Sequence, residues 1–241
     1  MRIGIDARML GAGYGIGRYL ECLTKEFLRR ALPHELVFFL RRNNWDMIPD
    51  APGTHKVICD VPWYSFSEQL TLPRIFAREK LDLLHVPHWN VPLLYRGRLV
   101  ITIHDLTMFH YPRPEATTLG PIAYFVKDRA HRFLVRAAAR RAGRILVPSE
   151  FTRQDIHTTL GVKMEKMTVT YLAPCKNERV SDCQLKDFGI SRPYVLYVGA
   201  AYPHKNVNGL LNTWKLFEHK FGSEYQLVIV GRQDAFYQRI R

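Results

Sequence analysis

The chain has 241 residues, 47% of them hydrophobic, so it is long enough to bury more than one core. No apolar run reaches the roughly 18 residues that span a bilayer. Asp6 and Arg8 stand where a signal peptide has its apolar stretch, and four cysteines without paired metal-ligand spacing are typical of a reduced protein, so we expect a cytoplasmic location. The formal net charge of +13 indicates an anionic partner: nucleic acid, an acidic membrane surface or a phosphorylated substrate.

Strand-like and helix-like segments alternate along most of the chain. Apolar runs predict strands at residues 2–6, 35–40, 56–59, 81–86, 99–103, 144–147 and 167–171. Helical spacing and capping residues predict helices at 17–31, 67–79, 121–144 and from Ser149, as the cap, to 160. This alternation predicts an α/β fold, a doubly wound parallel sheet with helices on both faces.

The alternation fades in a polar stretch and then restarts. A strand at 194–198, a helix at 206–221, a strand at 226–230 and a helix from about 234 follow that stretch. We therefore predict one Rossmann-like domain over 1–173, a linker over 174–192, and the beginning of a second Rossmann-like domain over 193–241.

A glycine-rich loop, GAGYGIGRY (Gly11–Tyr19), follows the first predicted strand. Glycines let the backbone approach a ligand closely, and the N-terminus of the following helix favours phosphate. The alternative is a turn whose glycines only begin the helix. The dinucleotide fingerprint is incomplete, because Ile16 and Arg18 occupy the positions of its last glycine and Arg41 and Arg42 replace the acid after the second strand. A nicotinamide dehydrogenase is therefore disfavoured.

Polar residues follow the strand predicted at 99–103. The segment VITIHDLTMFHY (Val100–Tyr111) places His104 and Asp105 at the carboxyl end of that strand, where open α/β sheets bind ligands. A histidine beside an aspartate there can bond a sugar hydroxyl or act as an acid or base. The alternative is a histidine that merely ends the strand.

A second polar group follows the strand at 81–86. His88, Trp89 and Asn90 are candidates to line the crevice, where a sugar or acceptor could stack on the indole; loop packing is the alternative for Trp89. A metal site is disfavoured, because no cysteine or carboxylate completes a ligand set, although four histidines lie near in sequence: His85, His88, His104 and His110.

The predicted helix over 121–144 is strongly basic, with Asp128 as its single acid. Helical spacing puts five arginines in one stripe and four apolar residues roughly opposite. The stripe consists of Arg129, Arg132, Arg136, Arg140 and Arg144, and the opposite face of Ala130, Leu134, Ala138 and Ala142. One interpretation is a solvated face. The other is attraction to anionic phospholipid, worth about 1 kcal/mol per basic side chain. Nucleic acid is disfavoured, because aromatic and basic residues do not interleave here.

In the second part, YVGAAYPHKN (Tyr197–Asn206) places Lys205 at the start of a helix after a strand and a proline-containing loop. A lysine beside free helix-terminal N–H groups can clamp a diphosphate. A solvated lysine at a proline-initiated helix start is the alternative.

Taken together, five motifs resemble glycosyltransferase family 4 in the family's order and spacing, over nearly the whole chain. They are GYGIGRY (Gly13–Tyr19), HVPHWNVPLL (His85–Leu94), TIHDL (Thr102–Leu106), VPSEFTRQDI (Val147–Ile156) and YVGAAYPHKN (Tyr197–Asn206). The resemblance implies the GT-B architecture of two facing Rossmann-like domains. It also implies a retaining transfer of a sugar, without a bound metal or other cofactor, from a nucleotide-sugar donor to a glycan or lipid-linked acceptor in cell-surface polysaccharide synthesis.

The resemblance also assigns roles to residues. It directs Gly15 and Gly17 to the donor phosphates and Lys205 to the diphosphate. It directs His104 to the transferred sugar, and we predict His104 and Asp105 as the catalytic residues. Ser149, at the end of another strand, joins the predicted sugar-binding or acceptor-binding set of His88, Trp89 and Asn90. We expect Gly15, Gly17, His104, Asp105, Ser149 and Lys205 to converge on one cleft between the two parts.

Three departures from the family pattern stand out. Ala200 replaces an arginine that many members carry, and His204 precedes the lysine where others have arginine. The acidic E-x7-E element that holds the donor would lie beyond Arg241. We therefore expect the N-terminal part of a longer family member, which is inactive by itself and is peripheral on the inner face of the cell membrane. A second hypothesis is a non-catalytic, membrane-associated module that binds a phosphorylated lipid or sugar.

Overall fold

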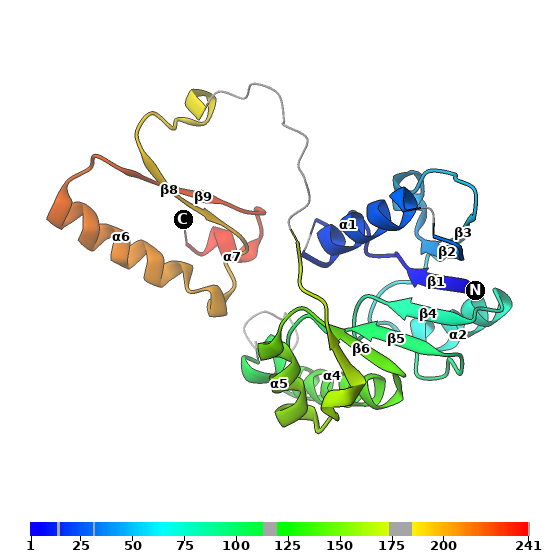
Figure 1. The fold of residues 1–241 in the computed structure, drawn as a ribbon. Coiled ribbons are helices and arrows are strands. Elements are labelled where there is room, and N and C mark those ends of the chain that lie inside the picture. Colours follow the sequence, from blue (N-terminus) through cyan, green and yellow to red (C-terminus); the bar gives the residue numbers. More distant parts are fainter. Residues whose placement is uncertain (14, 31, 113–119, 174–184, 241) are drawn as a thin grey trace. The chain divides into compact units, whose positions relative to one another are not determined.

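The computed structural model describes residues 1–13, 15–30, 32–112, 120–173 and 185–240, and the chain divides into two compact units. The first unit covers Met1–Cys175 and the second Lys176–Arg241 (Figure 1). Residues 174–184 of the predicted linker lie outside the described residues. Each unit is described by itself.

A sheet of seven parallel strands forms the centre of the first unit. Its spatial order is β3 (Thr54–Ile58), β2 (Glu35–Leu40), β1 (Arg2–Asp6), β4 (Leu83–Val86), β5 (Leu99–Thr102), β6 (Arg144–Val147) and β7 (Met167–Val169). The order reverses between β1 and β4, which is the point where such sheets open a crevice for ligands. The predicted parallel α/β sheet is confirmed.

Helices cover both faces of this sheet, α1 on one face and α2, α4 and α5 on the other (Figure 1). Their bounds are α1 (Gly15–Arg29), α2 (Phe66–Arg78), α3 (Thr107–His110), α4 (Pro121–Arg141) and α5 (Glu150–Leu160), with short 3₁₀ turns η1 (Arg42–Met47) and η3 (Met164–Lys166). Ser149 caps α5 as predicted, because its side chain accepts a hydrogen bond from the Thr152 amide. The first helix begins at Gly15, two residues earlier than predicted.

Strand β2 shows why the sheet is buried on both sides. Its sequence ELVFFL is apolar after the first residue, and successive side chains point to opposite faces. Phe38 packs with Leu20 of α1, while Phe39 packs with Phe76 of α2. The ring centroids of Phe39 and Phe76 lie 4.6 Å apart. One continuous apolar run therefore supplies two separate cores.

The predicted inward face of the basic helix is wrong in part. The residues that α4 and its end bury are Val135, Ala138, Ala139 and Ala142, a set with the i, i+3, i+4, i+7 spacing of one helix face. Ala130 is exposed, and Arg144 is the first residue of β6 rather than part of the helix. The helix therefore turns the face of Val135 and these alanines toward the sheet.

The second unit contains a two-stranded parallel sheet of its own. Its elements are η4 (Leu185–Phe188), β8 (Tyr194–Val198), η5 (Pro203–Lys205), α6 (Val207–Phe221), β9 (Gln226–Val230) and α7 (Ala235–Gln238). Strand β8 pairs with β9 and not with the first sheet, and its Val195, Leu196 and Val198 are exposed.

Two further observations concern the whole described chain. None of its helices combines the length and the apolar character that a membrane crossing requires. Cys59 is a free, buried thiol, whereas Cys22 on α1 is disulfide-bonded, so the expectation of reduced cysteines is wrong for Cys22.

Candidate functional site

The candidate site lies at the carboxyl edge of the first sheet. Because parallel strands end at the same edge, the residues that follow β1, β4, β5 and β6 gather there. Arg8 follows β1, His88 follows β4, His104 follows β5 and Ser149 follows β6. The fold therefore brings together segments from both ends of this unit, Arg8 near its start and Ser149 near its end.

The first turn of α1 contains both predicted glycines, which have different surroundings. A Cβ on Gly17 would lie 3.0 Å from the backbone nitrogen of Ala12 and from the backbone oxygen of Met9, so the helix packs closely on the loop before it. Gly15 is exposed, and no described atom lies within 4 Å of the position of a Cβ. Gly17 therefore has a structural reason to be glycine. Gly15 leaves the N-terminus of the helix open to an anion.

His104 is half-buried, and one of its ring nitrogens is occupied. Nε2 lies 3.1 Å from the backbone oxygen of Pro87, and because a carbonyl only accepts, Nε2 carries the hydrogen. Burial lowers the pKa of His104, although the Pro87 carbonyl and Asp105 oppose this effect. The ring is therefore neutral at pH 7, and Nδ1 is its hydrogen-bond acceptor. Such a nitrogen can accept a hydrogen bond from a sugar hydroxyl.

Sequence reasoning missed the residues that surround His104 on the α1 side. Tyr19 of α1 meets the His104 ring edge-on at 4.9 Å, and its hydroxyl lies 3.4 Å from Oγ1 of Thr102. The same Oγ1 lies 2.9 Å from Nε2 of His85. Burial, with His104 nearby, lowers the pKa of His85 to about 4, so this ring is neutral as well. The sequence did contain a signal for Tyr19, because Tyr19 is the last residue of the GYGIGRY motif and that motif continues into α1.

Asp105 and Ser149 both perform local structural roles. Oδ1 of exposed Asp105 accepts a hydrogen bond of 2.8 Å from the Thr107 amide, which begins α3. Oγ of Ser149 accepts from the Thr152 amide at 3.1 Å. These contacts leave the predicted ligand roles of Asp105 and Ser149 as predictions.

His88 and Asn90 belong to one buried group of hydrogen bonds. The Asn90 amide donates to Nδ1 of His88 at 3.2 Å, and Nδ2 of Asn90 donates to Glu68 of α2 at 2.8 Å. Asn90 is only 3% exposed. Its side chain therefore holds the loop after β4 against α2, and its predicted contact with a sugar stays a prediction.

Trp89, between these two residues, is half-buried and packs against the main core. Its ring lies 4.5 Å from those of His88 and His131, and 5.6 Å from that of Tyr64. These neighbours support the loop-packing interpretation of Trp89, and stacking on a sugar stays a prediction.

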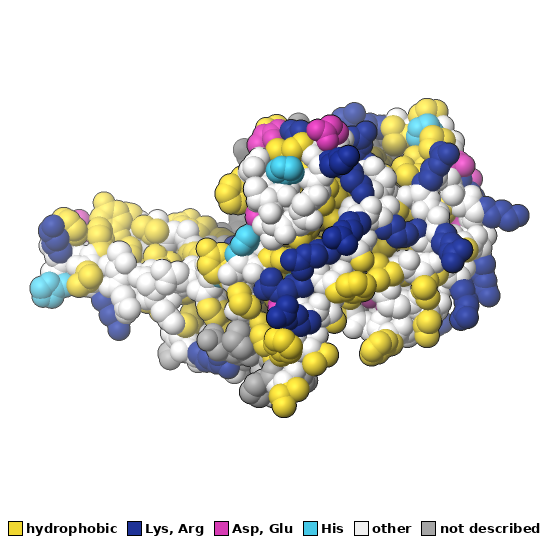
Figure 2. Space-filling model, turned by 90° about the horizontal axis from the view of Figure 1, so that it is seen from below, with side chains coloured by type: hydrophobic (Ala, Val, Ile, Leu, Met, Phe, Trp, Pro, Cys, Tyr) yellow, Lys and Arg dark blue, Asp and Glu magenta, His cyan; other side chains and the backbone are white. Residues whose placement is uncertain are grey.

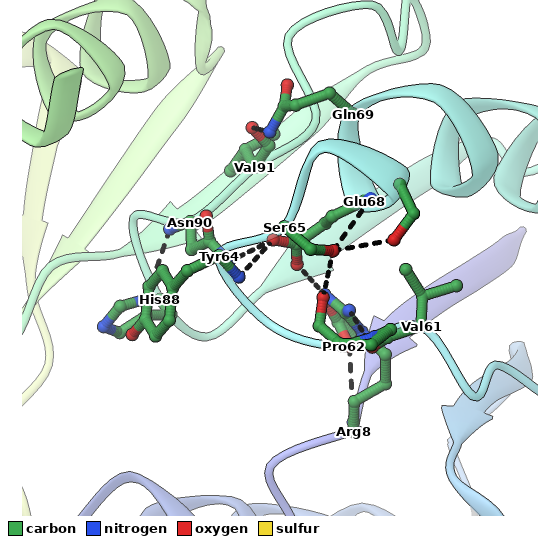
Figure 3. Close-up of polar contacts among 12 residues, drawn as sticks. Arg8, Val61, Pro62, Tyr64, Ser65, Glu68, Gln69, His88, Asn90 and Val91 are labelled. Carbon is green, nitrogen blue, oxygen red and sulfur yellow. Dashed lines mark hydrogen bonds and ion pairs between the residues drawn. The ribbon is translucent and has the colours of Figure 1, made fainter. Parts of the chain in front are cut away.

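Arg8 lies at the centre of a buried charge network that the sequence analysis did not identify (Figure 3). Its Nη2 lies 2.7 Å from Oδ2 of Asp6 and 2.8 Å from Oε1 of Glu68. Burial alone would lower the pKa of Arg8, but these two carboxylates outweigh burial and raise it. Asp6 and Arg8 at the end of the first strand were a signal, because opposite charges at a buried strand end require partners.

Lys205 lies in the second unit, in the exposed turn η5 before α6. Asn206, the cap of α6, accepts a hydrogen bond from the Gly209 amide through its side chain. Lys205 thus lies beside the N-terminus of a helix, as predicted. Its convergence with Gly15, Gly17 and His104 on one cleft stays a prediction.

The four histidines that lie near one another in sequence have separate polar partners. His85 contacts Thr102, whereas exposed His110 pairs with Asp155 at 2.8 Å. In the part of the chain that the structure describes, no three or more His, Cys, Asp or Glu residues are placed to hold a metal ion.

The first unit therefore has the form of a ligand-binding Rossmann-like domain. Its site combines an open helix N-terminus with neutral, buried histidines at the switch point of a doubly wound sheet. Such a site suits a ligand that joins uncharged hydroxyl groups to a phosphate.

Comparison with known sequences identifies the family. The sequence pattern described as Glycosyltransferase Family 4 matches residues 14–173. The chain belongs to glycosyltransferase family 4, as its motifs predicted.

Two relatives carry related names. The O-antigen chain mannosyltransferase RfbU of Salmonella typhimurium is 28% identical over 173 residues, which cover 71% of this chain and 43% of the relative. The O-antigen chain mannosyltransferase B of Escherichia coli is 26% identical over 242 residues, which cover 90% of this chain and 60% of the relative. The chain therefore spans less than two thirds of the length of these relatives.

Solved structures agree on the fold. WaaG, a glycosyltransferase involved in lipopolysaccharide biosynthesis, matches with a TM-score of 0.65 at 12% identity, covering 100% of this chain and 67% of WaaG. S. aureus MnaA, solved with UDP, matches with a TM-score of 0.54 at 11% identity, covering 100% of this chain and 64% of MnaA. At such identities the likeness concerns the fold alone, which is that of the GT-B enzymes.

Proposed function

We propose that this chain supplies the acceptor-side domain and the start of the donor-side domain of a glycosyltransferase for cell-surface polysaccharide. The observation that supports the proposal most is the site at the carboxyl edge of a family 4 domain, where neutral His104 packs against Tyr19 of α1 and the same helix begins at exposed Gly15. Both named relatives are O-antigen chain mannosyltransferases, so a nucleotide-activated mannose is the first donor to test. A non-catalytic module is not favoured.

In the proposed reaction the backbone N–H groups at Gly15 approach the donor phosphates, and Lys205 adds a cation from the second unit. Nδ1 of His104 accepts a hydrogen bond from the transferred sugar. Asp105 holds the start of α3 beside it. The transfer proceeds with retention of configuration and without a bound metal, and it takes place on the cytoplasmic side of the membrane.

The activity is tested on the protein encoded by the entire reading frame that contains this sequence. Incubation with a panel of nucleotide sugars and membrane extract should release free nucleotide with at least one donor. The 241-residue chain alone should not, because retaining transfer needs the donor oriented from both domains and β8 exposes apolar side chains here. If the entire protein releases no nucleotide with any donor, the proposed activity is wrong. If the 241-residue chain alone releases nucleotide robustly, the expectation that it is inactive by itself is wrong.

We also propose that α4 binds an anionic membrane surface. The helix carries four exposed apolar residues, between 58% and 82% exposed, with exposed basic residues among and after them. They are Ile122, Phe125, Val126 and Phe133, with Lys127, Arg129 and Arg140. On the face of the first unit seen in Figure 2, Lys and Arg side chains form a band with hydrophobic side chains beside it. Such a mixed surface suits a bilayer interface better than a purely basic one.

Two of the arginines predicted for this surface have other contacts. Arg132 bonds Asp128 at 2.7 Å and the Phe109 carbonyl at 3.1 Å, and the Arg136 guanidinium lies 5.4 Å from the centre of the Phe109 ring. Arg129, by contrast, lies 4.9 Å from the centre of the exposed Phe125 ring, so a cation and an apolar group are presented together.

Replacing Phe125 with serine should weaken binding to vesicles containing phosphatidylglycerol at least about tenfold, since a phenylalanine side chain is lost from the apolar boundary. The measurement is co-sedimentation of the 241-residue chain with such vesicles and with pure phosphatidylcholine, at low and high salt. Phe221→Ser, at an exposed phenylalanine of α6, is the matched control and should bind as the parent does. Equal binding to both lipids, or equal binding by the Phe125 variant, would contradict the proposal.

A further inference from the structure

A small polar cavity lies between the ends of β1 and β4. Its volume is about 10 Å³, and its polar lining consists of Asp6, Arg8, Trp63, His88 and Asn90. A cavity of this size holds about one water molecule or one hydroxyl group. The cavity is at the switch point of the sheet, on the same edge as His104.

Most polar groups around the cavity already have partners. The Arg8 guanidinium donates hydrogen bonds to Asp6, Glu68 and the Val61 carbonyl. Asn90 donates its side-chain N–H to Oε2 of Glu68, which also accepts from the Tyr64 amide at 2.8 Å (Figure 3). These contacts hold the loop after β4 in place and leave little capacity for a ligand.

Two donors are left over. Nδ1 of His88 accepts from the Asn90 amide, so the neutral ring carries its hydrogen on Nε2. The indole Nε1 of Trp63 is buried and has no hydrogen-bond partner among the described residues. A buried donor without a partner is unfavourable, so an oxygen atom in this cavity is favoured.

We propose that this cavity is a specificity subsite that receives one hydroxyl group of the acceptor sugar, whose oxygen accepts hydrogen bonds from Trp63 Nε1 and His88 Nε2. The inference rests on the proposed function and names two residues that would select its acceptor. Glu68, Arg8 and Asn90 are positioning residues, which act by fixing the His88 loop.

The charges around the cavity favour a neutral group. Arg8 is balanced by two carboxylates, Asp6 and Glu68, so a phosphate would meet net negative charge. Burial, with His104 nearby, lowers the pKa of His88 to about 3, so its ring stays an uncharged donor at every working pH. A site with fixed donors rejects an analogue that lacks the hydroxyl, because the donors are then left unpaired.

The test measures binding of methyl glycosides of mannose, glucose, galactose and N-acetylglucosamine, and of their monodeoxy forms, to the 241-residue chain by ligand-detected NMR. One parent sugar should bind, and removal of one particular hydroxyl should weaken its binding about tenfold or more. Trp63→Phe keeps the aromatic ring beneath the Arg41 guanidinium, 5.1 Å away, and removes only the N–H. It should abolish the discrimination at that one hydroxyl and leave binding of the matching deoxy sugar unchanged.

His88→Asn is the second variant, because its side-chain oxygen can still accept from the Asn90 amide while the Nε2 donor is lost. It should reduce the same discrimination. Trp214→Phe, in α6 of the second unit, is the matched control and should behave as the parent. A direct signal is the indole N–H resonance of Trp63, which should shift when the parent sugar binds and not when the deoxy form binds.

The subsite is overturned if no glycoside binds, if every deoxy form binds like its parent, or if both variants keep the discrimination. These outcomes are independent of nucleotide release by the entire protein. Sugar discrimination without any release from nucleotide sugars would overturn the proposed transferase activity and leave the subsite standing.

Discussion

Replacing Arg8 with methionine should lower the free energy of unfolding of the first unit by about 3–5 kcal/mol, because the change leaves two buried carboxylates without their cation. Asp6 is 5% exposed and Glu68 is fully buried. Neither carboxylate can therefore be hydrated unless it moves out of the core. Arg8 also donates to the Val61 carbonyl, and that oxygen would lose its partner too. Few single changes in this chain should cost as much.

The measurement is urea unfolding followed by tryptophan fluorescence. All variants carry Trp214→Phe, so that the remaining tryptophans, Trp45, Trp63 and Trp89, report on the first unit alone. Arg42→Met is the control for an exposed pair, since Arg42 bonds Asp60 at 2.8 Å at the surface, and it should change stability little. A loss below about 1 kcal/mol for the Arg8 variant would show that the network is not a source of stability.

A double variant examines the cause. Glu68→Gln removes one buried charge while its amide oxygen can still accept from Asn90, so combining it with Arg8→Met should recover part of the lost stability. An additive loss would contradict the account, because it would mean that the cost arises from lost packing rather than from unpaired charge.

Replacing His104 with alanine in the protein encoded by the entire reading frame should lower kcat/KM for the nucleotide sugar by about tenfold to a hundredfold, the effect of losing one well-placed hydrogen bond to the sugar. The physical reason is the Nδ1 acceptor, which the bond from Nε2 to the Pro87 carbonyl holds in place. The loss should exceed the change in stability, because the ring is half-buried and has few other polar contacts.

Matched variants separate the possible roles of His104. His104→Asn, which keeps an acceptor near Nδ1, should recover part of the rate. His110→Ala removes an exposed histidine six residues later, paired with Asp155, and should leave the rate unchanged. Protonation of the His104 ring should lower the activity as the pH falls. Because burial lowers the pKa of His104, this loss should begin only below the usual histidine pKa of about 6.5. A wild-type rate for the alanine variant would remove His104 from the site.

Local patterns in the sequence determined most of the secondary structure and several positions of the site. The run ELVFFL reads as a strand buried on both faces because strand side chains alternate and every one is apolar after the first. Ser149 is a recognisable cap, because its oxygen needs only the amide three residues on. His104 lies two residues after the end of strand β5, so its place at the carboxyl edge was predictable as soon as the sheet was parallel.

Tertiary structure decided which side chains meet there. Arg8 and Glu68 are 60 residues apart, and only the crossing of α2 back over β1 brings their charges together. The hydrogen on Nε2 of His104 is set by the Pro87 carbonyl from another strand end, which no local pattern contains. The face that α4 turns inward was likewise decided by which residues fit the sheet, since a helix with alanines on several sides has more than one apolar stripe to offer. Local sequence selects elements through backbone geometry and periodicity, whereas partners distant along the chain are selected by topology and close packing.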